Sequence, residues 1–190
     1  MNSNLSIKLL TPDDAVAYVD HLIRNAPTSG VGAPPISNPF PASHKIDGPA
    51  KIKSAQSCWT IPTEKLGWSR AWGVFSGNAI VGEVTLSTSR LIETQLHRAI
   101  LGIGIEPDFR GNGVGKALLR AALDWAKDQN SLVWIDLGVF AHNEAARHLY
   151  SKFGFLEVGR CVDCFRVDGL SVDNIEMTLH LPSAAKSFSS

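Results

Sequence analysis

A short glycine-rich junction with two cations is the part of this sequence best suited to chemistry. It links an apolar run, residues 100–105, to a helical pattern near Gly113, and it contains Arg110, Lys116 and further glycines at 111 and 115. Glycine permits positive φ and a close approach of a ligand to the backbone. Successive N–H groups in such a turn bind anions, and the following helix adds its free N–H groups and dipole. The junction therefore predicts a binding site for a pyrophosphate.

Two common nucleotide-binding loops are excluded by the spacing of these residues. A Walker A loop requires Gly five places before its Gly-Lys pair and Ser or Thr directly after it. Arg110 and Ala117 occupy those positions here. A dinucleotide-binding loop requires a third Gly where this sequence has Lys116. An ordinary tight turn between a strand and a helix is the alternative interpretation of the junction.

A second segment, residues 143–155, predicts a short helix with one chemically useful face. Asn143 is a favourable N-cap residue, and Gly154 suits the position just after a helix. Asn143 and Tyr150 are seven residues apart, almost two helical turns, so they share a face. Tyr150 is therefore a candidate catalytic residue. The alternative is an amphipathic core residue with its hydroxyl at the edge.

Together the two segments resemble motifs of the GCN5-related N-acetyltransferase (GNAT) superfamily. Arg110, Gly113 and Gly115 match the Arg/Gln-x-x-Gly-x-Gly/Ala core of its coenzyme A signature, and the Asn, Leu-Tyr and Gly-Phe pattern of 143–155 matches its second motif. The resemblance implies acetyl-CoA as co-substrate, with Asn143 at the pantetheine arm and Tyr150 at the thioester sulfur. The coenzyme-binding residues that it implies are Ile103, Gly104, Ile105, Arg110, Gly111, Asn112, Gly113, Val114, Gly115, Lys116, Asn143 and Tyr150.

Acetyl transfer to an amine requires a base, because an alkylammonium with a pKa near ~10 is only about 0.1% neutral at pH 7. The candidate bases are Glu83, His97, Asp136 and His142. We favour Glu83 as a catalytic residue, since burial in its apolar strand would raise the carboxyl pKa toward a useful value. A water-facing edge position is the alternative for Glu83. Tyr150 is expected to hydrogen-bond the leaving thiolate as charge develops on the sulfur.

The resemblance covers roughly residues 5–181 and implies an α/β (α+β) fold of the GNAT type. This fold has a mixed, mostly antiparallel central sheet of about seven strands with a splayed central pair, flanked by about four helices. The expected strands cover residues 5–10, 71–76, 79–87, 97–105, 132–140, 155–167 and 171–181, and the expected helices cover 11–24, 113–129 and 143–153. We expect a single domain over residues 1–182 and a flexible tail over 183–190.

The stretch from residue 26 to 59 is rich in proline and glycine and lacks a helical or strand period. It predicts a long loop. A long irregular connection inside one domain is commonly functional. Because the coenzyme motifs lie elsewhere, we expect this loop to form part of the acceptor pocket, as a semi-rigid lid.

Bulk composition excludes several other classes of protein. The 190 residues include 18 basic and 18 acidic side chains, so the basic excess of a nucleic-acid-binding surface is absent. No apolar run approaches the roughly 20 residues of a membrane span, and the start lacks the features of a signal peptide. A cytoplasmic protein without a membrane partner is expected. Three cysteines give no disulfide framework. Cys161 and Cys164 would face opposite sides of a regular strand, so no metal is expected.

The combined interpretation is an acyltransferase, an acetyl-CoA-dependent N-acetyltransferase in which a primary amine attacks the thioester directly. The expected acceptor is a small molecule such as an amino acid or a related amine, because the 132–181 segment looks like that of bacterial acetyltransferases acting on free amino acids. Two alternatives remain open. One is a protein N-terminal or lysine acetyltransferase, and the other is a non-catalytic acyl-CoA-binding module. A homodimer is compatible with each of them.

Overall fold

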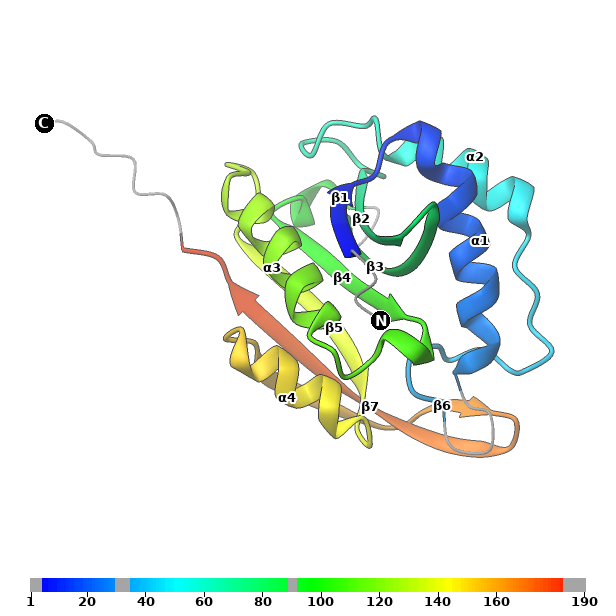
Figure 1. Ribbon diagram of the computed structural model, residues 1–190. Helices are drawn as coiled ribbons and strands as arrows, with labels where there is room; N and C mark the ends of the chain where they lie inside the picture. The colour runs from blue at the N-terminus through cyan, green and yellow to red at the C-terminus, as the bar shows by residue number, and fades with distance from the viewer. Residues whose placement is uncertain (1–4, 30–34, 89–91, 183–190) are drawn as a thin grey trace, which may run out of the picture.

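The computed structural model describes residues 5–29, 35–88 and 92–182, and their seven strands form one mixed sheet (Figure 1). The strands follow the order β1-β2-β3-β4-β5-β7-β6 across the sheet. Their bounds are β1 Leu5–Leu9, β2 Ser69–Ser76, β3 Ala79–Thr88, β4 Arg98–Ile105, β5 Trp134–Phe140, β6 Leu156–Val167 and β7 Leu170–His180. The α-helices are α1 Ala15–Asn25, α2 Gly48–Cys58, α3 Val114–Lys127 and α4 Glu144–Lys152. The expected tail lies outside the described residues.

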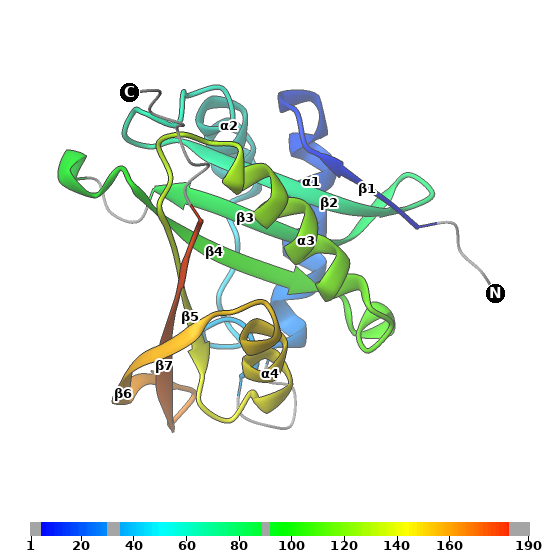
Figure 2. The same cartoon turned by 90° about the vertical axis from the view of Figure 1, so that its left-hand side faces the viewer.

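The predicted splay of the central strands is confirmed. β4 and β5 are parallel neighbours, but they pair only from Arg98 to Ile100 on β4 and from Trp134 to Asp136 on β5. Every other strand pair is antiparallel. Figure 2 shows β2, β3 and β4 lying across the view, whereas β5 and its antiparallel neighbour β7 lie close to vertical. Beyond Ile100 the two halves of the sheet therefore diverge and leave a wedge between them.

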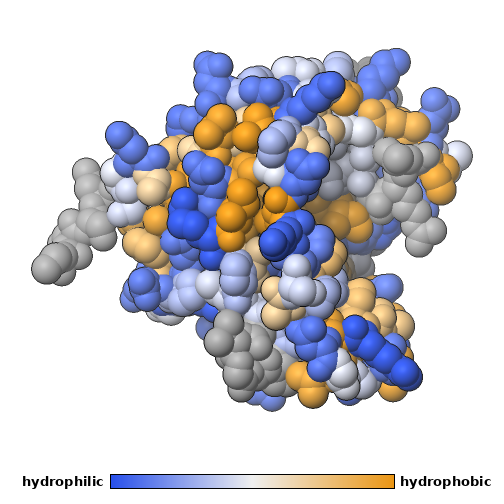
Figure 3. All heavy atoms as spheres, turned by 90° about the vertical axis from the view of Figure 1, so that its right-hand side faces the viewer, coloured by the Kyte–Doolittle hydropathy of each residue, from blue (hydrophilic) through white to orange (hydrophobic). Residues whose placement is uncertain are grey.

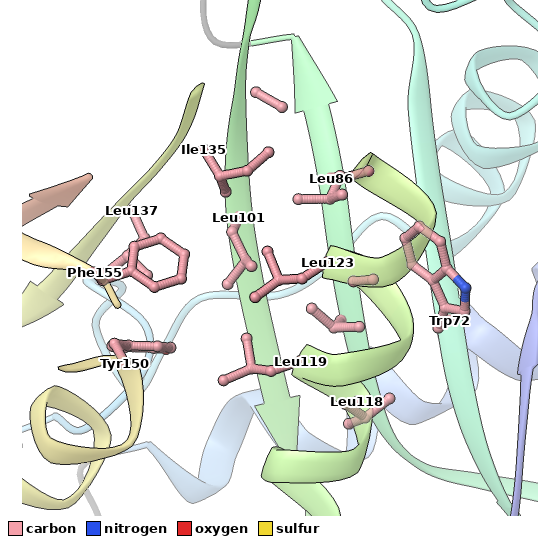
Figure 4. Close-up of a cluster of buried hydrophobic side chains, with 14 of the residues drawn as sticks. Trp72, Leu86, Leu101, Leu118, Leu119, Leu123, Ile135, Leu137, Tyr150 and Phe155 are labelled. Carbon is pink, nitrogen blue, oxygen red and sulfur yellow. The ribbon is translucent and has the colours of Figure 1, made fainter. Parts of the chain in front are cut away.

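The main core lies on the face of the sheet that α3 covers (Figure 4). Three leucines of α3, at 118, 119 and 123, are buried there against side chains of the strands. Fully burying a leucine side chain stabilises a fold by roughly 1.5–3 kcal/mol, so this stripe fixes α3 firmly on the sheet. Tyr150 and Phe155 join the same cluster beside α4, with ring centroids 5.8 Å apart.

The opposite face is covered by α1 and α2, and α2 corrects the prediction of a loop throughout 26–59. Asp47 caps α2 by accepting a hydrogen bond from the Ala50 N–H at 3.0 Å, and Pro49 occupies its first turn. Proline is favourable there, because the first helical N–H groups have no partner inside the helix. Trp59, just past α2, packs edge-on against Tyr18 of α1 with centroids 5.2 Å apart. Figure 3 views this side of the molecule, where apolar and hydrophilic surface alternate.

The β6–β7 hairpin corrects a second expectation. β6 is irregular between Cys161 and Phe165, and Asp163 within this irregularity has a φ of 50°. The strict alternation of faces assumed for Cys161 and Cys164 therefore does not apply. Interaction with the Cys161 thiol raises the pKa of Cys164. Across the described residues, no group of three or more His, Cys, Asp or Glu side chains could hold a metal ion.

None of the helices described here is both long enough and apolar enough to cross a membrane.

Candidate active site

A cavity of about 520 Å³ fills the wedge between β4 and β5, and it is called the wedge cavity below. Its walls come from the diverging ends of both strands, from the β4–α3 junction and from α4. Most of the residues predicted to bind the coenzyme line it, namely Ile103, Gly104, Ile105, Arg110, Gly111, Gly113, Gly115, Lys116, Asn143 and Tyr150. Asn112 and Val114 belong to the same junction but are not part of the lining; Val114 is buried in the core.

The glycine-rich junction has the open backbone that anion binding requires. Gly111 and Gly113 have φ values of 76° and 79°, and a Cβ atom on either would meet nothing within 4 Å. Among the described residues, none of the N–H groups from Gly111 to Gly115 donates a hydrogen bond to the protein. These donors lie at the N-terminal end of α3, where its dipole favours negative charge. The junction can therefore accommodate phosphate groups without rearrangement.

At Gly115, glycine is required by close packing and not by a positive φ. A Cβ there would lie 3.2 Å from a Leu149 methyl carbon and 3.3 Å from one of Ile105. Its absence lets α3, α4 and β4 approach one another at the end of the wedge cavity.

Arg110 and Asn143 make structural contacts within the protein, of which the sequence predicted only the cap that Asn143 provides for α4. The Arg110 Nε donates to the Ile105 carbonyl at 2.7 Å, and one terminal nitrogen donates to the Thr28 hydroxyl at 3.1 Å. Asn143 caps α4 by accepting from the Ala146 N–H at 3.1 Å, and its amide nitrogen donates to the Ile36 carbonyl at 2.8 Å. Both side chains thus shape the wedge cavity as well as line it.

Tyr150 is a core residue that also lines the wedge cavity. Its ring is packed in the main core with a relative exposure of 5%, and it points from α4 toward β4 (Figure 4). The residue also lines the wedge cavity. Burial, and then the charge of Glu83, raise the pKa of Tyr150 above the ordinary tyrosine value. The hydroxyl therefore stays protonated at neutral pH and can act as a hydrogen-bond donor in the cavity.

A second cavity, of about 580 Å³, lies on the other side of β4 and is called the α1–α2 cavity below. It is lined by α1, α2, β3, the end of β4 and residues 35–47, which are called the strap. Ser37, Ile103 and Gly104 line both this cavity and the wedge cavity. The two spaces therefore meet at the last residues of β4.

Glu83 lies at the inner wall of the α1–α2 cavity, where it is only 7% exposed. It is on an inner strand and directly opposite Gly104, so the alternative of a water-facing edge position is wrong. A Cβ on Gly104 would lie 2.9 Å from the Glu83 Oε1 and 2.8 Å from the Asn25 Nδ2. The glycine thus leaves space for two polar groups beside the β4 backbone.

The environment of Glu83 favours proton exchange near neutral pH. Burial raises its pKa from 4.5 to about 8, and the positive charge of Lys51 opposes part of that rise. Its Oε2 atom is buried, and no described protein group donates a hydrogen bond to it. A carboxyl group with one unpaired oxygen facing a cavity is suited to accept a proton from a bound ligand.

The other three candidate bases lie elsewhere or are already engaged. Asp136 forms a two-point contact with Arg98, at 2.7 and 2.5 Å, and accepts from Thr178 at 2.8 Å. His97 precedes β4 at the end opposite Gly104. The His142 Nε2 lies 2.8 Å from the Pro35 carbonyl oxygen of the strap. None of the three lines the α1–α2 cavity.

Sequence reasoning missed the polar side chains that α1 and α2 bring to the second cavity. These are Tyr18 and Asn25 of α1, and Lys51 and Ser54 of α2. The only local signal was Asp47 followed by Gly48 and Pro49, a favourable start for a helix. Nothing in the sequence placed that helix beside Glu83.

A larger hollow of about 720 Å³ lies between the outer sides of α3 and α4. Basic side chains surround it, including Arg120, Lys127 and Lys152, and its floor is apolar. It is lined neither by the glycines of the junction nor by a buried acidic side chain. The largest of the three spaces is therefore not the candidate site.

Comparison with known proteins agrees with the geometry. The profile of the acetyltransferase (GNAT) family matches residues 40–155. N-alpha-acetyltransferase RimI of Mycobacterium tuberculosis is 34% identical over 100 residues, which are 51% of this chain and 58% of that relative. The match thus spans little more than half of the relative's length.

Solved structures share the whole fold at low sequence identity. A GNAT acetyltransferase from Streptococcus pneumoniae superposes with a TM-score of 0.77 at 22% identity, over 93% of this chain and 99% of that one. The structure of yncA from Salmonella typhimurium, solved with its cofactor acetyl-CoA, gives a TM-score of 0.75 at 16% identity, over 97% and 98% of the two chains. With a family profile matched over more than half of its residues, this chain belongs to the GNAT acetyltransferase family.

Proposed function

We propose that this protein transfers an acetyl group from acetyl-CoA to the primary amine of a small molecule. One observation carries the proposal: a phosphate-compatible cavity and a cavity with a buried carboxyl group meet at Ile103 and Gly104. An amine and a thioester bound on the two sides would react at that junction. Holding them together supplies much of the rate of a reaction that otherwise depends on collision.

The residues of the wedge cavity fit acetyl-CoA along its length. The free N–H groups from Gly111 to Gly115 and the Lys116 side chain would hold the pyrophosphate. Beyond Ile100, β4 has no strand partner on its β5 side, so alternate backbone groups of 101–105 face the wedge. These groups and Asn143 are suited to hydrogen-bond the amides of the pantetheine arm. When bound, acetyl-CoA supplies the activated acetyl group.

Glu83 and Tyr150 would handle the protons of the reaction. Glu83 would take the proton of the acceptor ammonium, directly or through water, because its raised pKa of about 8 suits that exchange. Tyr150 would hydrogen-bond the sulfur as the thiolate leaves. The charge of Glu83 contributes to the raised pKa of Tyr150, which is consistent with the two groups lying near one reaction centre.

The strap favours a small acceptor over a protein acceptor, because it forms one wall of the α1–α2 cavity and is anchored to the rest of the fold. Ser29 holds it by accepting hydrogen bonds from the N–H groups of Ile36, Ser37 and Asn38 at 3.0–3.2 Å. At the far end, the Ala42 N–H donates to the Asp168 carboxylate at 2.9 Å. A protein substrate would require an open groove in the place of this anchored segment.

The direct test is an acetyl-CoA turnover screen that monitors release of free coenzyme A. The panel should contain amino acids, polyamines, aminoglycosides and short peptides. We expect turnover of at least one small-molecule amine. Turnover of peptides alone would favour a protein acetyltransferase. Acetyl-CoA binding without turnover of any amine would favour a non-catalytic module.

A further inference from the structure

We propose that the acceptor carries a carboxylate close to its amine, and that Lys51 on α2 recognises this carboxylate. The inference rests on the proposed function and adds the chemical class of the acceptor and the residue that selects it. It follows from the distribution of charge along the walls of the α1–α2 cavity.

One stripe of α2 faces this cavity. Asp47, Ala50, Lys51 and Ser54 line it, and their spacing of three or four residues places them on one side of the helix. Lys53, two residues from Lys51, is exposed and does not line the cavity. The orientation of α2, fixed by Ala55 and Trp59 against α1, therefore directs Lys51 and not Lys53 toward the site.

An acidic and two basic side chains lie at different depths of the cavity. Glu83 is buried at the β3 wall beside Gly104, whereas Lys51 and Lys45 are exposed residues at the rim. Within the described residues neither lysine forms an ion pair. The Asp47 carboxylate is already engaged with the Ala50 N–H. Asp47 keeps its negative charge in this hydrogen bond, but Lys45 and Lys51 outnumber it, so the rim presents an excess of positive charge to a ligand.

This arrangement matches an amino acid bound in one orientation. With its amine toward Glu83 and Gly104, where the two cavities meet, its carboxylate would lie toward the rim and Lys51. Lys51 and Glu83 line the same cavity, one exposed and the other buried, so a small molecule in this cavity can contact both. Leu22, Phe40 and Ile46 supply an apolar part of the lining for a side chain.

The same charges disfavour other amines. A polyamine or an aminoglycoside would bring additional ammonium groups toward Lys45 and Lys51, and like charges in a partly enclosed space repel each other. Selection of this kind combines attraction to one ligand with rejection of its competitors.

The test compares free amino acids with their carboxamides at saturating acetyl-CoA. Leucine and leucinamide, and phenylalanine and phenylalaninamide, differ little in size but differ in the negative charge. The amine of the amide has a pKa of about 8, as in a peptide, so its larger neutral fraction favours the amide in the chemical step. A preference for the free amino acid would therefore originate in recognition of the carboxylate.

We expect kcat/KM to be at least about 10-fold higher for the better amino acid than for its amide, the scale of one charge-assisted hydrogen bond. Lys51→Met should remove most of that preference by raising KM for the amino acid. Lys51→Arg should retain part of it. Lys53→Met is the matched control on the same helix and should leave both KM values unchanged. Loss of Lys51 also raises the Glu83 pKa, but this effect is common to the acid and the amide.

Equal kcat/KM values for acids and amides would overturn the inference, and so would a Lys51→Met variant that weakens both equally. Preferential turnover of polyamines would overturn it as well. In each of these cases the proposed acetyl transfer to a small amine would still stand. Absence of turnover with every amine would instead contradict the proposed function itself.

Discussion

The two cavities that meet at the end of β4 are built in different ways. The wedge cavity is formed mainly by chain segments close in sequence: β4, the junction that follows it, and the residues from β5 to α4. The α1–α2 cavity combines α1, the strap, α2 and β3, which are separate along the chain. The first can be recognised from local motifs, whereas the second exists only after the helices have packed.

The two cavities share a wall at the end of β4, where the proposed reaction would take place. Gly104 has no side chain, and so Glu83 and Asn25 approach the β4 backbone from the α1–α2 side. On the other side, the loss of pairing with β5 leaves that backbone open to the wedge cavity. A thioester and an amine on opposite sides of this strand end would be separated by little more than the backbone. Substitutions on the two sides should therefore affect binding of different substrates.

The largest effect is expected from Gly113→Asp, which acts on the wedge cavity alone. Gly113 has a φ of 79° and precedes the first turn of α3. An aspartate there would strain the backbone and place a negative charge where phosphate is expected. Calorimetry should detect no binding of acetyl-CoA, while circular dichroism remains native. Gly113→Ala separates the two causes, because it adds the strain without the charge. Undiminished affinity in a folded Gly113→Asp variant would contradict this assignment of the junction.

The next effect is expected from Tyr150→Phe. The change preserves the packing against Phe155 and removes only the hydroxyl group. We expect kcat to fall by ~10²–10⁴, the range for one positioned acid–base group, with little change in acetyl-CoA affinity. Stopped-assay kinetics combined with calorimetry would separate the two quantities. Wild-type kcat in this variant would leave Tyr150 with a packing role only.

The sequence predicted the segments that form the wedge cavity, but it missed most of those that form the α1–α2 cavity. The junction, α3 and the Tyr150 helix depend on glycine positions, capping residues and a 3.6-residue period, which are local signals. The mixed, mostly antiparallel sheet of seven strands and the splay of its central pair followed from the resemblance that those motifs supported, and the structure confirms both.

The features that the sequence did not predict depend on contacts between segments that are distant along the chain. α2 contains two serines and two lysines and is nearly without an apolar face, so its residues gave no helical period. Its stability comes from packing of Ala55 and Trp59 on α1. The sequence also did not predict the burial of Glu83, because this burial results from the packing of α1 on one face of β3 and α3 on the other. The irregularity in β6 between Cys161 and Phe165 carries no glycine or proline signal.

Glu83→Gln tests the role of the α1–α2 cavity, through the pH dependence of kcat/KM. The carboxyl group must be ionised to accept a proton, and its pKa is raised to about 8, so wild-type kcat/KM should increase with pH up to that region. The variant should lose about 10²-fold in kcat and lose this rising limb. Glu83→Asp keeps the charge and should retain the limb at a lower rate. An unchanged pH profile in Glu83→Gln would exclude Glu83 as the base.

The same residue predicts a change in stability with pH. The folded state keeps Glu83 protonated up to about pH 8, whereas the unfolded chain loses the proton near 4.5. Between these values the unfolded state binds fewer protons, so the free energy of unfolding falls as pH rises. Glu83→Gln should lack this decrease. Urea denaturation of both proteins at pH 5 and pH 8.5 would measure it, and an identical pH slope in the two would mean that Glu83 is ionised when buried.

The smallest effect is expected from Phe40→Ala, which tests whether the strap contacts the acceptor. Phe40 lines the α1–α2 cavity, stacks on His44 with centroids 4.3 Å apart and is 50% exposed. Since only part of its surface would be buried by a ligand, its loss should cost about 1 kcal/mol, well below full burial of an aromatic ring. The KM for the amine should therefore rise about fivefold, with kcat and acetyl-CoA affinity unchanged. Leu170→Ala is the matched control, because Leu170 is 47% exposed and lines neither cavity. If Phe40→Ala leaves the KM at the control value, the strap does not select the acceptor. Selectivity would then have to come from α1, α2 and the wall of the sheet.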